Sequence, residues 1–203
     1  GLGDVYKRQL SFHEGIVTTM IGPNGCGKSV FFKTLCGYSL LTEGQVIYRG
    51  KIIGKEQDFI DDAGIVIEEP EFINSLSGLE NLKILAGLKA AIGKKEILDS
   101  FERVGLDPHM KKHVAKYSLG MRQRLGIAQA IMEDQQLLIL DEPMNALDKD
   151  AVEEMRKLFL SFKASGKTML IVSHNEGDIS TLCDEVYEFD GAKIKNRESL
   201  RAV

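Results

Sequence analysis

The sequence predicts an α/β fold with a mostly parallel sheet, a small antiparallel side sheet and an inserted helical subdomain. Three observations support this prediction. Apolar runs of strand length alternate with segments whose apolar residues recur every three or four positions, as in βαβ units. A glycine-rich stretch joins the first strand to the first helix. A hairpin pattern and then a purely helical block interrupt the alternation.

The first part of the chain supplies a strand, a helix and the side sheet. Residues 15–21 form a buried apolar run, and the helix predicted after it begins at Lys28 and stops at Gly37, a typical C-terminal residue. In "GQVIYRGKIIG" apolar residues alternate on either side of an Arg-Gly turn, which indicates a hairpin. The apolar run "GIVIE", residues 64–68, is predicted to return to the main sheet.

A helical block follows at about residues 75–117. Ser77 is expected to cap its first helix, because Glu80 stands three residues further on, as in a capping box. Helical patterns then cover residues 78–88 and 94–104. The sequence therefore predicts an all-helical insertion between two parts of one core.

The remainder of the chain alternates again. A helix is predicted at residues 119–132, the strand "LLILD" at 137–141, a second helix at 151–162 and the strand "MLIVS" at 169–173. Strands that alternate with helices imply parallel pairing with helices on both faces of the sheet.

Domain organisation follows from this order. "GLGDVYKRQ", residues 1–9, closely resembles the translated remnant of a sequencing adapter, so we interpret it as a non-native leader and expect natural sequence to start near Leu10. The alternative is a genuine N-terminal strand. Residues 10–203 are expected to form a single domain, with its core at about 10–74 and 118–203 and its helical insertion at about 75–117.

Composition limits the class of protein. The 203 residues carry a net charge of -4 and are 43% hydrophobic, but no apolar run approaches the roughly 20 residues that cross a bilayer. Any membrane role is therefore expected to come through a partner. No basic run marks a nucleic-acid surface. The three cysteines lack CxxC spacing, which argues against a zinc site or a disulfide framework and fits a reducing cytosol.

The glycine-rich stretch "GPNGCGKS" fits the phosphate-loop pattern G-x-x-x-x-G-K-[ST], in the strand-to-helix context that this motif requires. Its backbone N–H groups and the positive helix end are expected to face a phosphate chain. Lys28 would reach the β and γ phosphates, and Ser29 would bind Mg²⁺. The motif predicts a P-loop NTPase core whose ATP site comprises Gly22, Pro23, Asn24, Gly25, Cys26, Gly27, Lys28, Ser29 and Val30. Cys26 is interpreted as a small filler residue in preference to a redox-regulated thiol.

Two adjacent acids end the strand in "LLILDEP", at the sheet edge where α/β proteins bind ligands. We assign Asp141 to Mg²⁺ through water, and Glu142 to the attacking water as general base. His174 follows the next strand. By itself it would be a helix-capping or packing histidine, but its place at the end of a neighbouring strand favours a role at the γ-phosphate.

Six ordered motifs together resemble the ATP-binding subunit of ABC transporters over nearly all of residues 10–195. They are "GPNGCGKS", "IEEP", "YSLGMRQR" in the place of the usual LSGGQ, "LLILDEP", "NALD" at 145–148 and the switch histidine His174.

The resemblance implies an ATPase that works as a head-to-tail pair, either homodimer or heterodimer. Ser118 and Gly120 would contact the γ-phosphate bound to a second subunit, and the loop ending at Asp148 would cross the interface. Glu68 would occupy the switch position facing Mg²⁺ and the attacking water. The helical block would dock on an integral-membrane permease, which places the subunit in the cytoplasm, peripheral to the inner face of the cell membrane.

Three departures from the family pattern stand out. Glu68 replaces the usual glutamine, and Val30 replaces a threonine whose hydroxyl would lie near the α-phosphate. The adenine-stacking aromatic would fall within residues 1–9, so Tyr6 is not assigned that role.

Glu68, "GLENL" and "SLGM" together resemble the branch that exports bacitracin and lantibiotic-type peptides, although branches exporting drugs, polysaccharides or lipids share parts of this pattern. The alternatives are a soluble ABC-type ATPase without a permease and a non-catalytic nucleotide-gated binding module. The sequence specifies neither the transported substrate nor the direction of transport.

Overall fold

A computed structural model of the chain describes residues 10–190 and 193–199. The predicted leader at residues 1–9, with Tyr6, lies outside the described residues. The elements in chain order are β1 (Val17–Ile21), α1 (Lys28–Cys36), β2 (Ile47–Tyr48), β3 (Lys51–Ile52), β4 (Ala63–Val66), α2 (Gly78–Lys89), α3 (Lys94–Arg103), a 3-10 turn (Val114–Lys116), α4 (Leu119–Ile131), β5 (Leu137–Asp141), α5 (Lys149–Ala164), β6 (Thr168–Val172), α6 (Glu176–Leu182), β7 (Glu185–Asp190) and β8 (Lys193–Ser199).

The main sheet has the strand order β4-β5-β6-β1-β7-β8. Neighbouring strands are parallel from β4 to β7, and only the β7–β8 pair is antiparallel. Residues alternate between its faces, so Leu138 and Leu140 pack with α2 to α5 whereas Ile139 packs on the α1 side with Phe32. The prediction of a mostly parallel sheet covered on both faces is confirmed.

Helix α1 begins and ends where its glycines predict. Gly27 (φ 103°) and Gly37 (φ 89°) both have left-handed backbone conformations, which glycine adopts without steric strain. The Gly37 N–H bonds back to the last turn of the helix. Lys28 is therefore the first residue of a helix that points its N-terminus at the phosphate loop.

The predicted side sheet is present as a two-stranded antiparallel hairpin, β2 and β3. Arg49 and Gly50 form its turn, with φ values of 48° and 79°. Two consecutive positive φ values are typical of the tight turn that matches strand twist in a two-residue hairpin.

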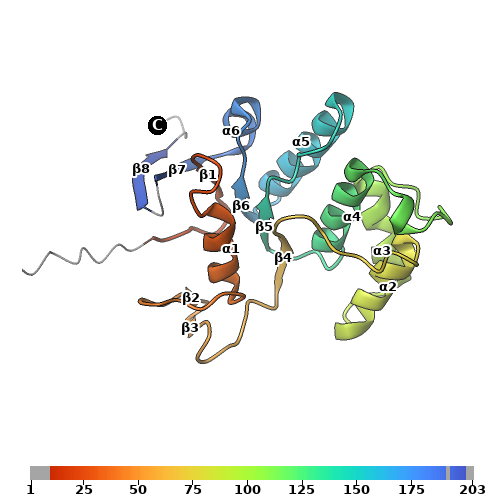
Figure 1. Ribbon diagram of the computed structural model, residues 1–203, viewed down its shortest axis with the longest axis horizontal. Coiled ribbons are helices and arrows are strands. Elements are labelled where there is room, and N and C mark those ends of the chain that lie inside the picture. Colours follow the sequence, from red (N-terminus) through yellow and green to blue (C-terminus); the bar gives the residue numbers. More distant parts are fainter. Residues whose placement is uncertain (1–9, 191–192, 200–203) are drawn as a thin grey trace, which may run out of the picture.

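Helices α2 and α3 lie at the end of the molecule opposite to β8, beside α4 (Figure 1). The capping box at the start of α2 is formed: the Ser77 hydroxyl accepts from the Glu80 N–H, and the Glu80 carboxylate accepts from the Ser77 N–H at 2.7 Å. No helix of the described segments combines the length and apolarity that a bilayer crossing needs.

Strands β7 and β8 have no counterpart among the elements predicted from sequence. Strand β7 lies beside β1, and its Tyr187 and Phe189 pack on the α1 face of the sheet. Acidic residues interrupt its apolar pattern, so this segment carries only a weak strand signal. Pairing with β1 is what makes it a strand.

The β4–α4 contact offers a test of the packing. A Cβ atom at Gly64 would lie 1.9 Å from the Ala130 carbonyl oxygen, too close for any side chain. We expect Gly64→Ala to destabilise the fold by about 3 kcal/mol, because a β4–α4 shift must relieve the overlap. In thermal unfolding this corresponds to a drop of about 6–12 °C.

The matched control is Gly87→Ala in the exposed interior of α2, where an added Cβ meets nothing within 4 Å. This change should stabilise the helix by about 0.5–1 kcal/mol. Equal melting temperatures for Gly64→Ala and the parent would contradict the β4–α4 packing.

Candidate functional site

A pocket of about 580 Å³ opens at the carboxyl ends of β1, β4 and β5. It gathers residues of the phosphate loop, the "IEEP" segment, the start of α4 and the loop after β5. Its lining is Asn24, Gly25, Gly27, Lys28, Ser29, Val30, Glu68, Glu69, Pro70, Leu119, Arg122, Gln123, Asp141, Glu142, Asn145 and Ala146. Nine of the predicted site residues therefore share one pocket. The other predicted residues, Gly22, Pro23, Cys26, Ser118, Gly120, Asp148 and His174, do not line it.

The phosphate loop is shaped by backbone that only glycine tolerates. Gly22 has φ 148°, and a Cβ there would lie 2.5 Å from the Phe189 carbonyl oxygen. Lys28 is only 7% exposed, and its ammonium donates to the carbonyl oxygens of Gly22 and Pro23 at 2.8 and 2.9 Å. The loop thus holds a buried positive charge at the N-terminus of α1, where an anion gains from both. The site fits a phosphate chain.

Asp141 ends β5 facing this loop and is 8% exposed. Burial raises the pKa of its carboxyl group, and the nearby charges of Glu142 and Glu68 raise it further. A hydrogen bond from Ser29 and the charge of Lys28 act in the opposite direction. A desolvated carboxylate among like charges is stabilised by a cation.

The oxygen donors of Ser29 and Asp141 fit Mg²⁺, which is usually held by one or two carboxylates together with substrate phosphates. Within the described part of the chain there is no cluster of three or more His, Cys, Asp or Glu side chains that could hold a metal alone. In a nucleotide complex, phosphate oxygens and water would supply the other ligands of such an ion.

Glu142 is held from two sides. Its residue has a left-handed backbone (φ 46°), and its N–H donates to Val172 at the end of β6. The His174 Nε2 atom lies 2.9 Å from Oε1, and the Asn145 amide donates to Oε2. The carboxylate is thereby fixed at the pocket wall. His174 lines a second cavity of about 280 Å³, which Glu142 also lines.

The two interpretations of His174 can now be separated. The cap of α6 is Asn175, whose side-chain oxygen accepts from the N–H groups of Gly177 and Asp178. His174 is left to contact Glu142, and its role at the γ-phosphate stays a prediction.

Glu68 does not continue a strand, because β4 ends at Val66 and Glu68 itself has φ 61°. Its side chain lines the pocket while its Oε1 lies 2.7 Å from the Lys33 ammonium on α1. Proximity to Asp141 agrees with the predicted switch position. The ion pair with Lys33 was not anticipated, and direct ligation of Mg²⁺ by Glu68 stays a prediction.

Ser118 and Asp148 have local roles within this chain. Each caps a helix: the Ser118 hydroxyl accepts from the Met121 N–H at 3.2 Å, and the Asp148 carboxylate accepts from the Ala151 N–H at 2.9 Å. Gly120 allows α4 to approach the "NALD" loop closely, since a Cβ there would lie 2.9 Å from the Ala146 carbonyl oxygen. Contact of these residues with a second subunit stays a prediction.

Lys33 and Gln123 are among the side chains of the pocket region that sequence reasoning missed. Lys33 lies on α1 with no motif to mark it. Gln123, 9% exposed, donates to the backbone carbonyls of Glu142 and Pro143 and so supports the turn that aims Glu142. Its place within "YSLGMRQR" was the available signal.

Comparison with known proteins places the chain in a family. The profile of the family described as "ABC transporter" matches residues 6–145. A Bacillus subtilis protein named as an uncharacterized ABC transporter ATP-binding protein, YybJ, is 37% identical over 94% of this chain and 87% of its own. The lantibiotic transport ATP-binding protein SrtF of Streptococcus pyogenes is 36% identical over 93% of this chain and 82% of its own. The bacitracin transport ATP-binding protein BcrA of Enterococcus faecalis is 38% identical over 90% of this chain and 60% of its own.

The fold agrees with these matches. The solved dimeric structure of the ATP-binding cassette MJ0796 with ADP and Pi superposes with a TM-score of 0.84 and 23% identity, over 96% of this chain and 89% of that one. The family match and the relatives confirm the resemblance seen in the six motifs, including its bacitracin and lantibiotic branch. The chain belongs to the ABC transporter family and is an ATP-binding, ATP-hydrolysing subunit of it.

Proposed function

We propose that this subunit hydrolyses Mg²⁺-bound ATP as one half of a head-to-tail pair and powers a membrane permease that exports antimicrobial peptides, drugs or related compounds. One observation carries the proposal: a single pocket joins the phosphate loop with Lys28 to the carboxylates of Asp141 and Glu142. The site thus contains both a cradle for the phosphates and a base for the attacking water.

Binding uses the loop and its lysine. The backbone N–H groups and Lys28 would hold the β and γ phosphates, and Ser29 and, through water, Asp141 would hold Mg²⁺. The bound ion would neutralise the charge that develops on the γ-phosphate. Val30 supplies no hydroxyl to this cradle and stands 61% exposed at its edge.

Hydrolysis uses the Glu142 carboxylate, which accepts a proton from the attacking water. In this structure both of its oxygens are engaged, one by His174 and one by Asn145. Each oxygen keeps a second lone pair that can accept from the attacking water. His174, held beside Glu142, would orient the reaction at the γ-phosphate.

A second copy would complete the site. Leu119 at the start of α4 and Val30 on α1 are both 61% exposed at the pocket, and Ser118 beside them is exposed. A head-to-tail partner would cover these apolar side chains and bring its own Ser118 and Gly120 to the γ-phosphate. ATP would close such a pair, and hydrolysis would reopen it.

The transport role is supported by the relatives named for lantibiotic and bacitracin transport. They favour a transporter subunit over a soluble ABC-type ATPase. On this proposal the protein lies in the cytoplasm against the inner face of the cell membrane, held there by the permease. A neighbouring reading frame with several membrane-length apolar spans would identify that partner.

Phosphate release from ATP tests the proposal. The isolated subunit should be a slow ATPase whose rate rises more than linearly with protein concentration, because two chains form each site. Glu142→Gln should lower the rate by about 100- to 1000-fold through loss of the base. Glu71→Gln, at an exposed loop acid, is the control and should keep the parental rate. Hydrolysis by Glu142→Gln at the parental rate would refute the base assignment.

Asp141 links function to stability. Since its pKa is raised in the folded state, the ionised carboxylate destabilises the nucleotide-free protein above that pKa, and protonation relieves this as the pH falls through it. Asp141→Asn should therefore raise the melting temperature at pH 7 in EDTA while weakening Mg²⁺-dependent ATP binding. The difference in melting temperature from the parent should shrink at acidic pH. A lower melting temperature for the variant at pH 7 would contradict this account.

The Glu68–Lys33 ion pair is expected to influence how strongly ATP binding depends on the Mg²⁺ concentration. Neutralising Glu68 (Glu68→Gln) should flatten the Mg²⁺ dependence of ATP binding, whereas Lys33→Met frees the carboxylate and should make the dependence steeper. Binding of a fluorescent ATP analogue during Mg²⁺ titration measures both. Lys95→Met, at an exposed lysine on α3, controls for the loss of a positive charge. Matching curves for Glu68→Gln and the parent would remove Glu68 from the site.

A further inference from the structure

The loop that carries His174 is short, and the His174 side chain has few polar contacts of its own. Residues 173–175 connect β6 to α6, and the His174 side chain is 40% exposed. Within the described residues, its imidazole makes a polar contact with Glu142 and no other side chain. The position of the ring must therefore be set by the backbone on either side of it.

Both neighbours of His174 are anchored. The buried Ser173 hydroxyl donates to Asp178 Oδ2 at 3.2 Å and accepts from the Asn175 N–H. The Asn175 side-chain oxygen accepts from the first N–H groups of α6. The loop is thus closed onto the N-terminal turn of α6, with Asp178 at its centre.

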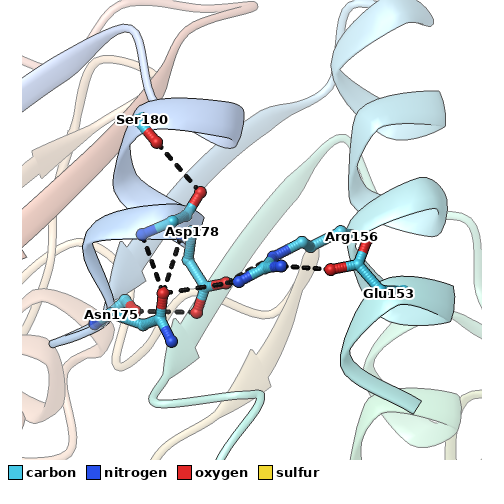
Figure 2. A network of polar contacts seen from close by, with 7 residues as sticks. Glu153, Arg156, Asn175, Asp178 and Ser180 are labelled. Carbon is cyan, nitrogen blue, oxygen red and sulfur yellow. Dashed lines mark hydrogen bonds and ion pairs between the residues drawn. The ribbon is translucent and has the colours of Figure 1, made fainter. Parts of the chain in front are cut away.

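Arg156 ties this loop to α5 (Figure 2). Its Nε and Nη2 atoms lie 2.7 and 2.6 Å from Asp178 Oδ1, and Nη2 donates to Asn175 at 3.4 Å. Asp178 is 4% exposed, so this guanidinium supplies the partner that a buried carboxylate requires. Its remaining nitrogen, Nη1, is paired with Glu153 on the same helix.

Helix α5 also follows directly on the loop that holds Glu142. Asn145, which donates to the second oxygen of Glu142, precedes the Asp148 cap of α5 by three residues. The two partners in the Glu142–His174 contact are therefore steadied from one helix, Glu142 through the loop before it and His174 through Arg156.

We propose that Arg156 is a positioning residue for ATP hydrolysis: its contacts with Asp178 and Asn175 fix residues 173–175 and thereby hold the His174 imidazole against Glu142. This inference rests on the roles proposed above for Glu142 and His174. Arg156 touches neither nucleotide nor water in this account and acts through the loop.

Steady-state kinetics on the full chain test the proposal. Arg156→Met should lower kcat by about 10- to 100-fold, because a displaced His174 no longer orients the reaction, while leaving nucleotide affinity unchanged. Fluorescent-nucleotide binding measures affinity separately. A parental kcat for folded Arg156→Met would overturn the proposal.

Lys163→Met is the matched control. Lys163 also lies on α5 and pairs with a nearly buried acid, Asp184, at 2.9 Å, but it has no part in the His174 loop. The control should lose stability and keep the parental kcat at temperatures where it is folded. If it lowers kcat as much as Arg156→Met does, the effect comes from a loosened α5 and the proposal fails.

A second variant covers the case in which Arg156→Met does not fold because Asp178 is left buried and unpaired. The double change Arg156→Met with Asp178→Asn removes that charge as well as the link to α5. It should fold and still show the lowered kcat. A parental kcat in the double variant would overturn the proposal.

Nitrogen NMR of the histidine rings gives a readout that needs no turnover. The contact with Glu142 requires a proton on His174 Nε2, which gives that ring a fixed tautomer in the parent. Comparison with a His174→Gln variant assigns the His174 signals among those of the four histidines. Arg156→Met should lose this fixed signature, and Lys163→Met should keep it. Should the parent chain fail to hydrolyse ATP, the proposed function fails while this measurement still decides the positioning role; an unchanged His174 signature in Arg156→Met overturns the positioning role alone.

Discussion

Parallel pairing of β5, β6 and β1 is the constraint on which the site depends. Because the strands run in one direction, their carboxyl ends meet at a single edge of the sheet. Each of these ends carries residues of the proposed ATP site. The phosphate loop follows β1. Asp141 is the last residue of β5, and Glu142 comes directly after it. His174 lies in the loop after β6. Antiparallel pairing would send these groups to opposite edges.

Gathering these groups has an electrostatic consequence. Burial and like charges raise the pKa of Asp141, so the nucleotide-free edge carries unfavourable charge at neutral pH. Two lysines offset part of this negative charge. Lys28 does so within the phosphate loop, and Lys33 does so by pairing with Glu68. The same arrangement favours binding of a cation together with an anionic ligand. The cation neutralises the carboxylates, and the anion neutralises the lysine ammonium groups. The site is thus less stable alone than in its proposed complex.

Rigidity of the edge comes from residues outside it. Gln123 on α4 supports the Glu142 turn, and Arg156 on α5 supports the loop of His174. Both act by hydrogen bonds to backbone or to a buried carboxylate, which fix a loop more firmly than exposed contacts do. The helices that cover the sheet therefore also position the proposed catalytic groups, Glu142 and His174.

The sequence by itself determined the strand–helix order as far as β6, the phosphate loop, the acids at the end of β5 and the caps at Ser77 and Gly37, because each depends on neighbours within a few residues. The tertiary structure decided what depends on distant partners. Strand β7 exists through pairing with β1, and Glu68 meets Lys33 because β4 and α1 share an apolar cluster that includes Ile65 and Phe32. Likewise, the contact of His174 with Glu142 required the pairing of β5 with β6, because local pattern alone would make His174 a capping or packing residue. Interactions between neighbours in sequence determine the individual helices, caps and loops. Contacts between residues far apart in the chain determine which side chains meet at the site.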